Sequence, residues 1–362
     1  MENLEEIRRE IDAIDEQMAG LFERRMEQSR KVAEYKMARG LAVTDSGREA
    51  EVIKRNASLV SDRQIRDHYI NFEKDVIEIS KQYQRALMDG MKVAYSGKPG
   101  AFAYIAATRL FPNALPVPYP DFTKAYKACA DGECDAVVLP FENSFAGDVS
   151  TVTDLMFSGD LYVNQVIEVE VEHCLAALPD ADPAGIQLVV SHPQALSQCE
   201  EYIKAKGLRE EEFSNTADAA KAVAAKGDPT VAAICSREAA EIYGLKVVEA
   251  RINTSRSNTT RFAAFNRTLN LVRDNRKMGK HFILMFTVKN EAGALAKTLN
   301  IIGTHNYNMC NLHSRPMKTL MWSYSFFIEL DGDIATAEGD MMLRELGSVC
   351  DRLKLVGSFF KR

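Results

Sequence analysis

The polar run Arg256-Ser257-Asn258-Thr259-Thr260-Arg261-Phe262 leads directly into a short apolar segment that ends at Phe265. Its seven residues carry three hydroxyl groups, one amide and two guanidinium groups. A polar loop that feeds an apolar strand is a common place for a binding or catalytic site, because loops carry function on a rigid scaffold. Alone, the run is as compatible with a solvated turn as with a site.

Two further polar runs follow apolar strands upstream. Val137-Val138-Leu139 leads into Pro140-Phe141-Glu142-Asn143-Ser144, and Val189-Val190 leads into Ser191-His192-Pro193-Gln194. Ligands of open α/β sheets bind beyond the carboxyl ends of the strands. The three loops therefore predict one cleft in an α/β fold.

These runs also form a family pattern. P-x-E-N-S with Gly147 four residues after the Asn, S-H-P-Q followed by Gln198 and Cys199, and N-x-T-R-F occur in this order. The set resembles prephenate dehydratase, which implies a bilobal α/β domain with Thr260 as the candidate catalytic residue. The resemblance implies catalytic or substrate-binding roles for the other polar residues of the loops: Glu142, Asn143, Ser191, His192, Gln194, Gln198 and Arg261.

The proton for the departing hydroxyl has several candidate sources. Loss of carbon dioxide and hydroxide from prephenate needs a proton donor, while aromatisation supplies the driving force. A threonine hydroxyl is barely acidic, so Thr260 is expected to be a positioned hydrogen-bond donor. Carboxyl and imidazole groups such as Glu142 and His192 are the more usual acids. The sequence leaves these alternatives open.

Composition is typical of a soluble globular protein of two or three domains: 362 residues, 46% hydrophobic and 27% charged. No apolar run approaches the roughly 18 residues of a spanning helix, and the acidic start argues against a secretory signal. Seven cysteines without a C-x-x-C pair predict reduced thiols. We therefore expect a cytoplasmic protein without metal or other cofactor. A net charge of −6 predicts neither nucleic-acid nor membrane binding.

The first 90 residues have helical periodicity. Apolar residues from Leu4 to Leu21 are spaced three and four apart behind Asn3 as N-cap, and the same spacing returns from Ile65 to Tyr83. A shorter helix between them begins at Thr44, Asp45 or Ser46. Three such elongated helices cannot bury their own apolar seams, which predicts a homodimer or a higher homo-oligomer.

Basic residues on these helices form a second pattern. Arg25 and Lys36 are eleven residues apart, within about 20° of one helix face. This spacing favours Arg25 over its neighbour Arg24. Arg8 lies seventeen residues before Arg25, which is roughly 25 Å along the helix axis and about 100° off the face of Arg25. It can therefore reach the same small ligand only from another subunit. Taken singly, each of these cations is expected to be a solvated ion-pair former.

As a set, these residues resemble the all-helical chorismate mutase domain: an arginine in the first turns, an arginine pair, a lysine eleven residues on, D-x-x-R-E and S-x-x-x-Q. Chorismate rearranges by a pericyclic shift, so the enzyme need only hold the compact conformer and stabilise charge on the ether oxygen. The resemblance implies that Lys36 and Gln84 donate to that oxygen. It implies substrate binding by Arg8 of the partner subunit, Arg25, Asp45, Arg48, Glu49 and Ser80.

Strand and helix patterns alternate from residue 91 to about residue 267, with parallel pairing expected. After a polar linker, residues 281–362 have the order βαββαβ, which predicts a ferredoxin-like unit. Two tracts in it, G-A-L and S-R-P, resemble the ACT regulatory domain of phenylalanine-inhibited dehydratases. The resemblance implies phenylalanine binding by Gly293, Ala294, Leu295, Met309, Ser314 and Arg315. His313 departs from the family's usual Glu, which predicts weaker inhibition.

The chain as a whole thus resembles the bifunctional chorismate mutase/prephenate dehydratases. The fold expected is multidomain: an all-α mutase domain at 1–90, a bilobal α/β dehydratase domain at 91–268 and an α+β ACT domain at 281–362. Such an enzyme converts chorismate to prephenate and then to phenylpyruvate, with feedback inhibition by phenylalanine. The rival hypothesis is a binding module, a helical dimeriser joined to a two-lobed solute sensor. The acidic charge and the helical cation set favour the enzyme.

Overall fold

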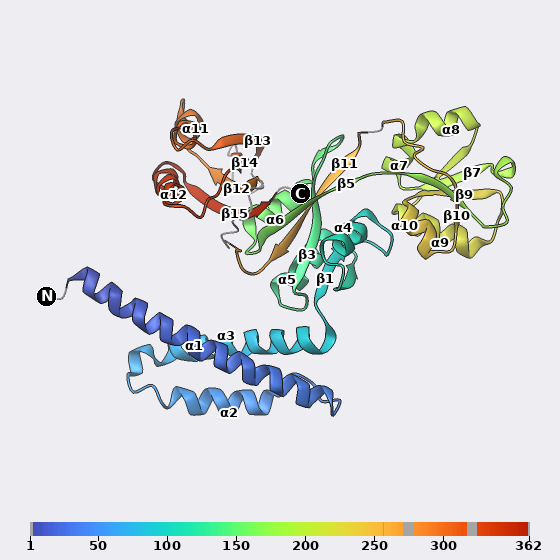
Figure 1. The fold of residues 1–362 in the computed structure, drawn as a ribbon. Helices are drawn as coiled ribbons and strands as arrows, with labels where there is room; N and C mark the ends of the chain where they lie inside the picture. Colours follow the sequence, from blue (N-terminus) through green and yellow to red (C-terminus); the bar gives the residue numbers. More distant parts are fainter. Residues whose placement is uncertain (1–2, 256, 271–278, 317–323, 361–362) are drawn as a thin grey trace. The chain divides into compact units, whose positions relative to one another are not determined.

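The computed structural model describes residues 3–255, 257–270, 279–316 and 324–360. Arg256, in the polar run that opened the sequence, lies outside the described residues. The chain divides into two compact units, Met1–Lys92 and Val93–Arg362 (Figure 1). Each unit is compact by its own internal contacts.

The first unit consists of three helices, α1 (Leu4–Met37), α2 (Ser46–Ala57) and α3 (Arg63–Asp89). Asn3 and Glu6 form the capping box that starts α1, and Asp45 is the N-cap of α2. Within α1, burial is confined to Ser29 and Ala33, whereas the apolar stripe from Leu4 to Leu21 is exposed. The unit therefore has a long unburied apolar seam, as its periodicity predicted.

The second unit contains a large mixed sheet with the strand order β13-β14-β12-β15-β5-β11-β3-β1-β2, and β4 pairs with β3. This order joins strands from both ends of the unit. The elements of its first part are β1 (Lys92–Ser96), α4 (Phe102–Leu110), β2 (Leu115–Tyr119), α5 (Phe122–Ala130), β3 (Ala136–Asn143), β4 (Gly147–Asp148), α6 (Ser150–Ser158), β5 (Tyr162–Glu170) and β11 (Thr259–Asn266).

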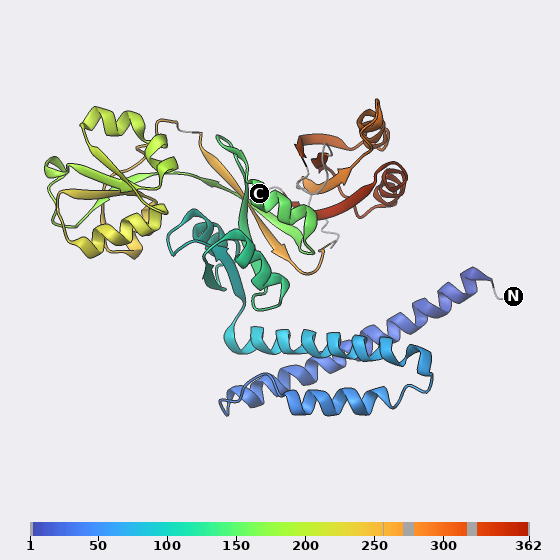
Figure 2. The same ribbon diagram turned by 180° about the vertical axis from the view of Figure 1, so that it is seen from behind.

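A second sheet has the order β10-β6-β9-β7-β8 and is covered by helices on both faces (Figures 1 and 2). One apolar core packs α7 and α8 against it, and a separate core packs α9 and α10. Its elements are β6 (Cys174–Ala177), a 3₁₀ turn (Pro183–Gly185), β7 (Leu188–Ser191), α7 (Pro193–Gln198), α8 (Glu200–Lys206), β8 (Arg209–Glu212), α9 (Thr216–Lys226), β9 (Val231–Cys235), α10 (Arg237–Ile242) and β10 (Lys246–Glu249).

Strand pairing corrects the expectation of a parallel fold. β1 is parallel to β3, and β7 is parallel to β8 and β9. However, β11 is antiparallel to both β3 and β5, and β6 is antiparallel to β9 and β10. Parallel neighbours need a crossover connection in the same sheet, whereas β5 leaves for the second sheet and β11 returns from it, so they run in opposite directions.

The sequence also missed some elements. β2, with Pro116 and Pro118, lies at the sheet edge, where proline is tolerated because no ladder donor is needed on the outer side. Neither α5 nor the exposed edge strand β8 was predicted. The segment after Ser191 forms two helices, α7 and α8, which are divided at Cys199.

The last part of the chain has the predicted βαββαβ order: β12 (Lys280–Thr287), α11 (Ala294–Thr304), β13 (Asn308–Pro316), β14 (Tyr324–Asp331), α12 (Ala337–Val349) and β15 (Arg352–Phe360). Phe282 and Leu284 of β12 pack in the core that includes α11 and α12. Ile283 and Met285, on the opposite face, pack in the core that includes β3, α5 and α6. This sheet is therefore buried on both faces and shares a core with the preceding α/β part. No helix of the described residues is long and apolar enough to span a bilayer.

One close contact joins the two parts of the large sheet. β15 pairs with β5 at Gly357 and Val163, and a Cβ on residue 357 would lie 2.0 Å from the Val163 carbonyl oxygen. We predict that Gly357→Ala destabilises the second unit by roughly 2 kcal/mol or more, because the backbones must separate. Gly347→Ala on α12 is the matched control, since a Cβ there meets nothing within 4 Å. Equal urea midpoints for the two variants would contradict the prediction.

Candidate active sites

The first unit contains a cavity of about 190 Å³ between its three helices. Every residue predicted for the mutase site from this chain itself lines it: Arg25, Lys36, Asp45, Arg48, Glu49, Ser80 and Gln84. Arg8 is exposed, in the second turn of α1, and does not line the cavity. The helices thus gather seven predicted residues and leave Arg8 apart, as the helix geometry required.

Hydrogen bonds fix several of these side chains. Arg25 Nη1 donates to Ser80 Oγ and to the Val76 carbonyl oxygen, and Lys36 Nζ donates to the Val43 carbonyl oxygen. Gln84 is buried, and its Oε1 has no hydrogen-bond partner among the described residues. A buried carboxamide with an unused oxygen is expected to meet a ligand.

Lys81 is a member of this cavity that the sequence did not reveal. Its Nζ lies 3.1 Å from Glu49 Oε2 and 2.8 Å from Glu78 Oε2. Burial alone would lower the pKa of Lys81, but bonds to Glu78 and Glu49 raise it above its ordinary value, so the ammonium is charged. Its position three residues before Gln84 on one helix was the available signal. The described lining has four cations against two carboxylates, which suits a dianion.

A second cavity, of about 300 Å³, lies in the second unit. It brings together five residues predicted from three separate loops: Asn143, His192, Gln194, Gln198 and Thr260. Asn143 Oδ1 accepts backbone N–H groups from Phe145 and Ala146 at 3.0 and 2.8 Å, which fixes the orientation of the amide. Asn143 Nδ2 then donates to Thr260 Oγ1 at 2.9 Å. Because Oγ1 is the acceptor in that bond, the Thr260 hydroxyl proton is left for a ligand.

His173 also lines this cavity and was missed by the sequence analysis. The residue is 2% exposed, its Nε2 lies 2.9 Å from Gln198 Oε1, and its ring contacts Phe102 edge-on. Burial lowers the pKa of His173 and outweighs the hydrogen bond to Gln198 Oε1, which raises it. The ring is therefore neutral, and donation from Nε2 to Oε1 leaves the Gln198 NH₂ group for a ligand. No motif surrounds His173, so only its burial identifies it.

Apart from the two histidines, the described residues that line this second cavity have no ionisable side chain. Four helices begin at it: α4 at Phe102, α5 at Phe122, α7 with His192 as N-cap, and α9 with Asn215 as N-cap. Free backbone N–H groups at helix N-termini favour anions. An anionic ligand would therefore meet neutral donors rather than cations. The described residues contain no group of three or more His, Cys, Asp or Glu that could hold a metal ion.

Family models match both of the chain segments that contain these cavities. A family model described as "Chorismate mutase type II" matches residues 7–85, and one described as "Prephenate dehydratase" matches residues 93–269. The bifunctional chorismate mutase/prephenate dehydratase of Escherichia coli (strain K12) is 28% identical, with 98% of this chain and 95% of that protein covered. The chloroplastic arogenate dehydratase/prephenate dehydratase 2 of Arabidopsis thaliana is 31% identical, with 77% and 76% covered.

The chain belongs to the family of bifunctional chorismate mutase/prephenate dehydratases. It is an enzyme of phenylalanine biosynthesis that rearranges chorismate to prephenate and converts prephenate to phenylpyruvate. A prephenate dehydratase from Arthrobacter aurescens, solved in complex with L-Phe, has the same fold over 75% of this chain and 90% of that one, with 24% identity and a TM-score of 0.68. Membership of this enzyme family shows that the rival hypothesis of a binding module is wrong.

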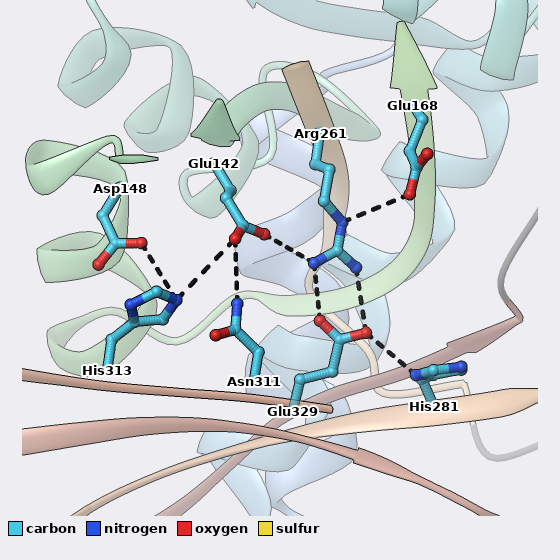
Figure 3. A network of polar contacts seen from close by, with 8 residues as sticks. All are labelled: Glu142, Asp148, Glu168, Arg261, His281, Asn311, His313 and Glu329. Carbon is cyan, nitrogen blue, oxygen red and sulfur yellow. Dashed lines mark hydrogen bonds and ion pairs between the residues drawn. The ribbon is translucent and has the colours of Figure 1, made fainter. Parts of the chain in front are cut away.

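Glu142 and Arg261 lie on the face of β3 and β11 opposite Thr260, which corrects the expectation that they share the dehydratase cavity. Successive side chains of a strand alternate between faces. The register pairs Thr260 with Asn143 and Arg261 with Glu142. Figure 3 shows Arg261 directed instead at Glu142 and at Glu329 of β14. Burial alone would lower the pKa of Arg261, but these bonds raise it above its ordinary value.

Ser191 does not line the dehydratase cavity either. Its side chain is fully buried, and Oγ donates to the Ile234 carbonyl oxygen at 2.6 Å, which ties β7 to β9. The S-H-P-Q tract therefore supplies its serine to the sheet and presents His192 and Gln194 to the cavity. Sequence alone could not separate these roles, because it does not show that β7 ends at Ser191, just before His192.

The predicted effector residues are spread over α11 and β13. Gly293 is the N-cap of α11 with φ +84°, Ala294 follows it, and Leu295 packs at the edge of the core beneath α11. Met309 and Ser314 are exposed on β13. Arg315 is occupied elsewhere, because Nη1 donates to the Ser150 carbonyl oxygen at 2.6 Å and Nη2 lies 3.4 Å from Asp154.

We predict that His173 makes the dehydratase unit less stable in acid. Its pKa is lowered in the folded state, so the unfolded chain binds the proton more readily as pH falls below about 6.5. Stability associated with His173 is thus present above that pH and lost below it. His173→Phe, which keeps an aromatic ring, should lose less unfolding free energy between pH 7.5 and 5.5 than the unaltered protein. Identical losses in urea unfolding would contradict this.

Proposed function

We propose that the two reactions take place at the two cavities, the mutase reaction among α1, α2 and α3 and the dehydratase reaction beside Thr260. The observation that carries this proposal is the hydrogen bond from Asn143 to Thr260 inside a cavity lined by both sheet regions. The corresponding domain limits are 1–90 for the mutase, 91–268 for the dehydratase and 281–362 for an ACT domain.

In the mutase cavity, chorismate is held by charge and oriented by hydrogen bonds. Arg25 and Arg48, with Arg8 of the partner subunit, bind its carboxylates, and Glu49 accepts from the ring hydroxyl. Lys36 and Gln84 donate to the ether oxygen, where charge develops in the transition state. Gln84 has no proton to lose, so its donor is retained as pH rises. The exposed seam of α1 supports the homodimer that this site requires.

In the dehydratase cavity, prephenate loses carbon dioxide and hydroxide together. The electrons of the breaking C–C bond enter the ring as the C–O bond breaks, and the departing hydroxide takes a proton to become water. Thr260 donates a hydrogen bond to the departing oxygen, and Asn143 holds Thr260 in place. His192 Nδ1 accepts the Gln194 N–H at 3.2 Å, so its Nε2 is the ring atom that donates a hydrogen bond to substrate oxygen, and the proton that converts hydroxide to water comes from solvent. The NH₂ of Gln198 binds substrate oxygen.

The C-terminal βαββαβ part is proposed to bind phenylalanine and to inhibit the dehydratase in a cytoplasmic enzyme. The L-Phe complex of the Arthrobacter aurescens dehydratase, which has the same fold, supports this. Gly293 begins α11 with an N-terminus open to a carboxylate. Leu295 and Met309 are the candidates for the wall around the ring, and Ser314 for a polar contact. His313 predicts weaker inhibition than a Glu would give.

Separate sites predict reciprocal losses of activity. Thr260→Ala should lower dehydratase turnover about a hundredfold or more, because the departing hydroxide loses its hydrogen bond, while mutase turnover is retained. Lys36→Ala should have the opposite effect, with prephenate still converted when it is supplied directly. Chorismate consumption and phenylpyruvate formation, assayed separately, check both variants. Loss of both activities in either variant would show that the sites are not independent.

A shared mutase site predicts complementation between two inactive variants. Arg8→Ala and Lys36→Ala each damage both sites of a homodimer, but a mixed dimer contains one site with both residues intact. Random mixing in equal amounts should therefore restore about a quarter of the mutase sites. Subunit exchange is verified first with differently tagged chains. No recovery after proven exchange would place Arg8 outside the site.

A further inference from the structure

The back of the catalytic strand pair is held by the C-terminal sheet. Figure 3 shows the Arg261 guanidinium between two carboxylates: Nη1 donates to Glu142 Oε2 at 2.7 Å and to Glu329 Oε2 at 2.8 Å, and Nη2 donates to Glu329 Oε1 at 3.1 Å. The Glu329 and Arg261 side chains are 3% and 15% exposed. Glu329 on β14 thus makes a bidentate ion pair with Arg261 on β11, and both side chains are largely shielded from water.

Two residues of this cluster, Arg261 and Glu142, are neighbours in sequence of residues that line the cavity beside Thr260. Arg261 follows Thr260 on β11, Glu142 precedes Asn143 on β3, and Thr260 and Asn143 are themselves hydrogen bonded on the front face. β13 joins the same cluster, because Asn311 Nδ2 donates to Glu142 Oε1 at 3.0 Å. A shift of β13 or β14 therefore displaces residues directly bonded to the catalytic pair.

Stability alone does not account for this cluster. Withdrawing a guanidinium and a carboxylate from water costs free energy that their attraction often only balances, so a buried ion pair is weak evidence for a gain in stability. The fork geometry of Arg261 with Glu329 adds directional constraint. Phe141, whose ring lies 4.9 Å from the guanidinium carbon, shields the pair further. What the cluster supplies is a fixed position for β11.

We propose that Glu329 is a positioning residue of the dehydratase. It acts through Arg261 to fix Thr260 and Asn143, and the same contact transmits the state of the C-terminal sheet to the cavity. The second part rests on the proposed regulation by phenylalanine. A ligand shifts such an equilibrium only as far as it binds the two arrangements differently, so loss of the contact uncouples inhibition without abolishing binding.

The test compares Glu329→Gln with a matched control, Glu168→Gln, in the full chain. Glu168 is on β5, and its carboxylate lies 4.0 Å from Arg261 Nε. Its side chain is 45% exposed, and it belongs to a strand that precedes the C-terminal βαββαβ part. We expect Glu329→Gln to lower kcat for prephenate about tenfold or more with little change in KM, because the catalytic pair loses its alignment. Glu168→Gln should retain turnover, and neither change should affect mutase turnover.

The same variants test the coupling. Phenylalanine is titrated against dehydratase rate, and its binding is measured by calorimetry. Glu329→Gln is expected to bind phenylalanine with a Kd close to that of the unaltered protein but to show several-fold weaker maximal inhibition. Full inhibition in this variant, or equal kcat values for the two glutamine variants, would overturn the proposal.

Two controls separate other failures from failure of the proposal. If urea unfolding shows that Glu329→Gln is not folded at the assay temperature, Asn311→Ala decides, since it removes only the less buried link to Glu142. It should lower kcat in the same direction. If the unaltered protein neither binds phenylalanine nor is inhibited by it, the proposed regulation fails, and kcat alone then decides whether Glu329 positions the site.

Discussion

The antiparallel pairing of β3 with β11 is the contact on which both faces of the dehydratase depend. Its register places Asn143 opposite Thr260 and Glu142 opposite Arg261. Because side chains alternate along a strand, one pair enters the cavity and the other enters a buried ion-pair cluster. A shift of β11 by one residue would exchange Thr260 with Arg261, bringing a charge to the cavity and a hydroxyl group to the cluster.

The two cavities differ in the way they can hold an anion. The cavity of the first unit has four cations in its described lining, whereas the cavity beside Thr260 is lined by amides, hydroxyls, imidazoles, apolar side chains and the starts of α4, α5, α7 and α9. The proposed assignment of one reaction to each cavity accounts for the difference. Chorismate keeps both carboxylates, so tight ion pairs hold its conformer. Prephenate must lose one as carbon dioxide, and a carboxylate held by neutral donors is less stabilised against that loss than one paired with an arginine.

The C-terminal sheet is part of the dehydratase core as well as a separate βαββαβ motif. Ile283 and Met285 pack with the core beneath β3, while Phe282 and Leu284 pack under the motif's own helices. The close backbone contact at Gly357 continues the sheet from one part to the other. The C-terminal part therefore contacts β5 and β11 through packing, hydrogen bonds and the Glu329–Arg261 pair, which are the contacts that the proposed coupling requires.

The sequence by itself determined the helical unit, the order of strands and helices in the C-terminal motif, and the residues of the mutase cavity. These follow from local periodicity and from fixed spacings along rigid helices, as with Arg25 and Lys36. It also identified Thr260, Asn143 and Gln198. Only the tertiary structure decided that Arg261 and Glu142 face away from Thr260, that Ser191 is buried, that His173 and Lys81 line the cavities, and that Glu329 pairs with Arg261. Those outcomes depend on strand register, on which face packs against which core, and on burial. Each of these is set by residues distant in the chain, which no local pattern records.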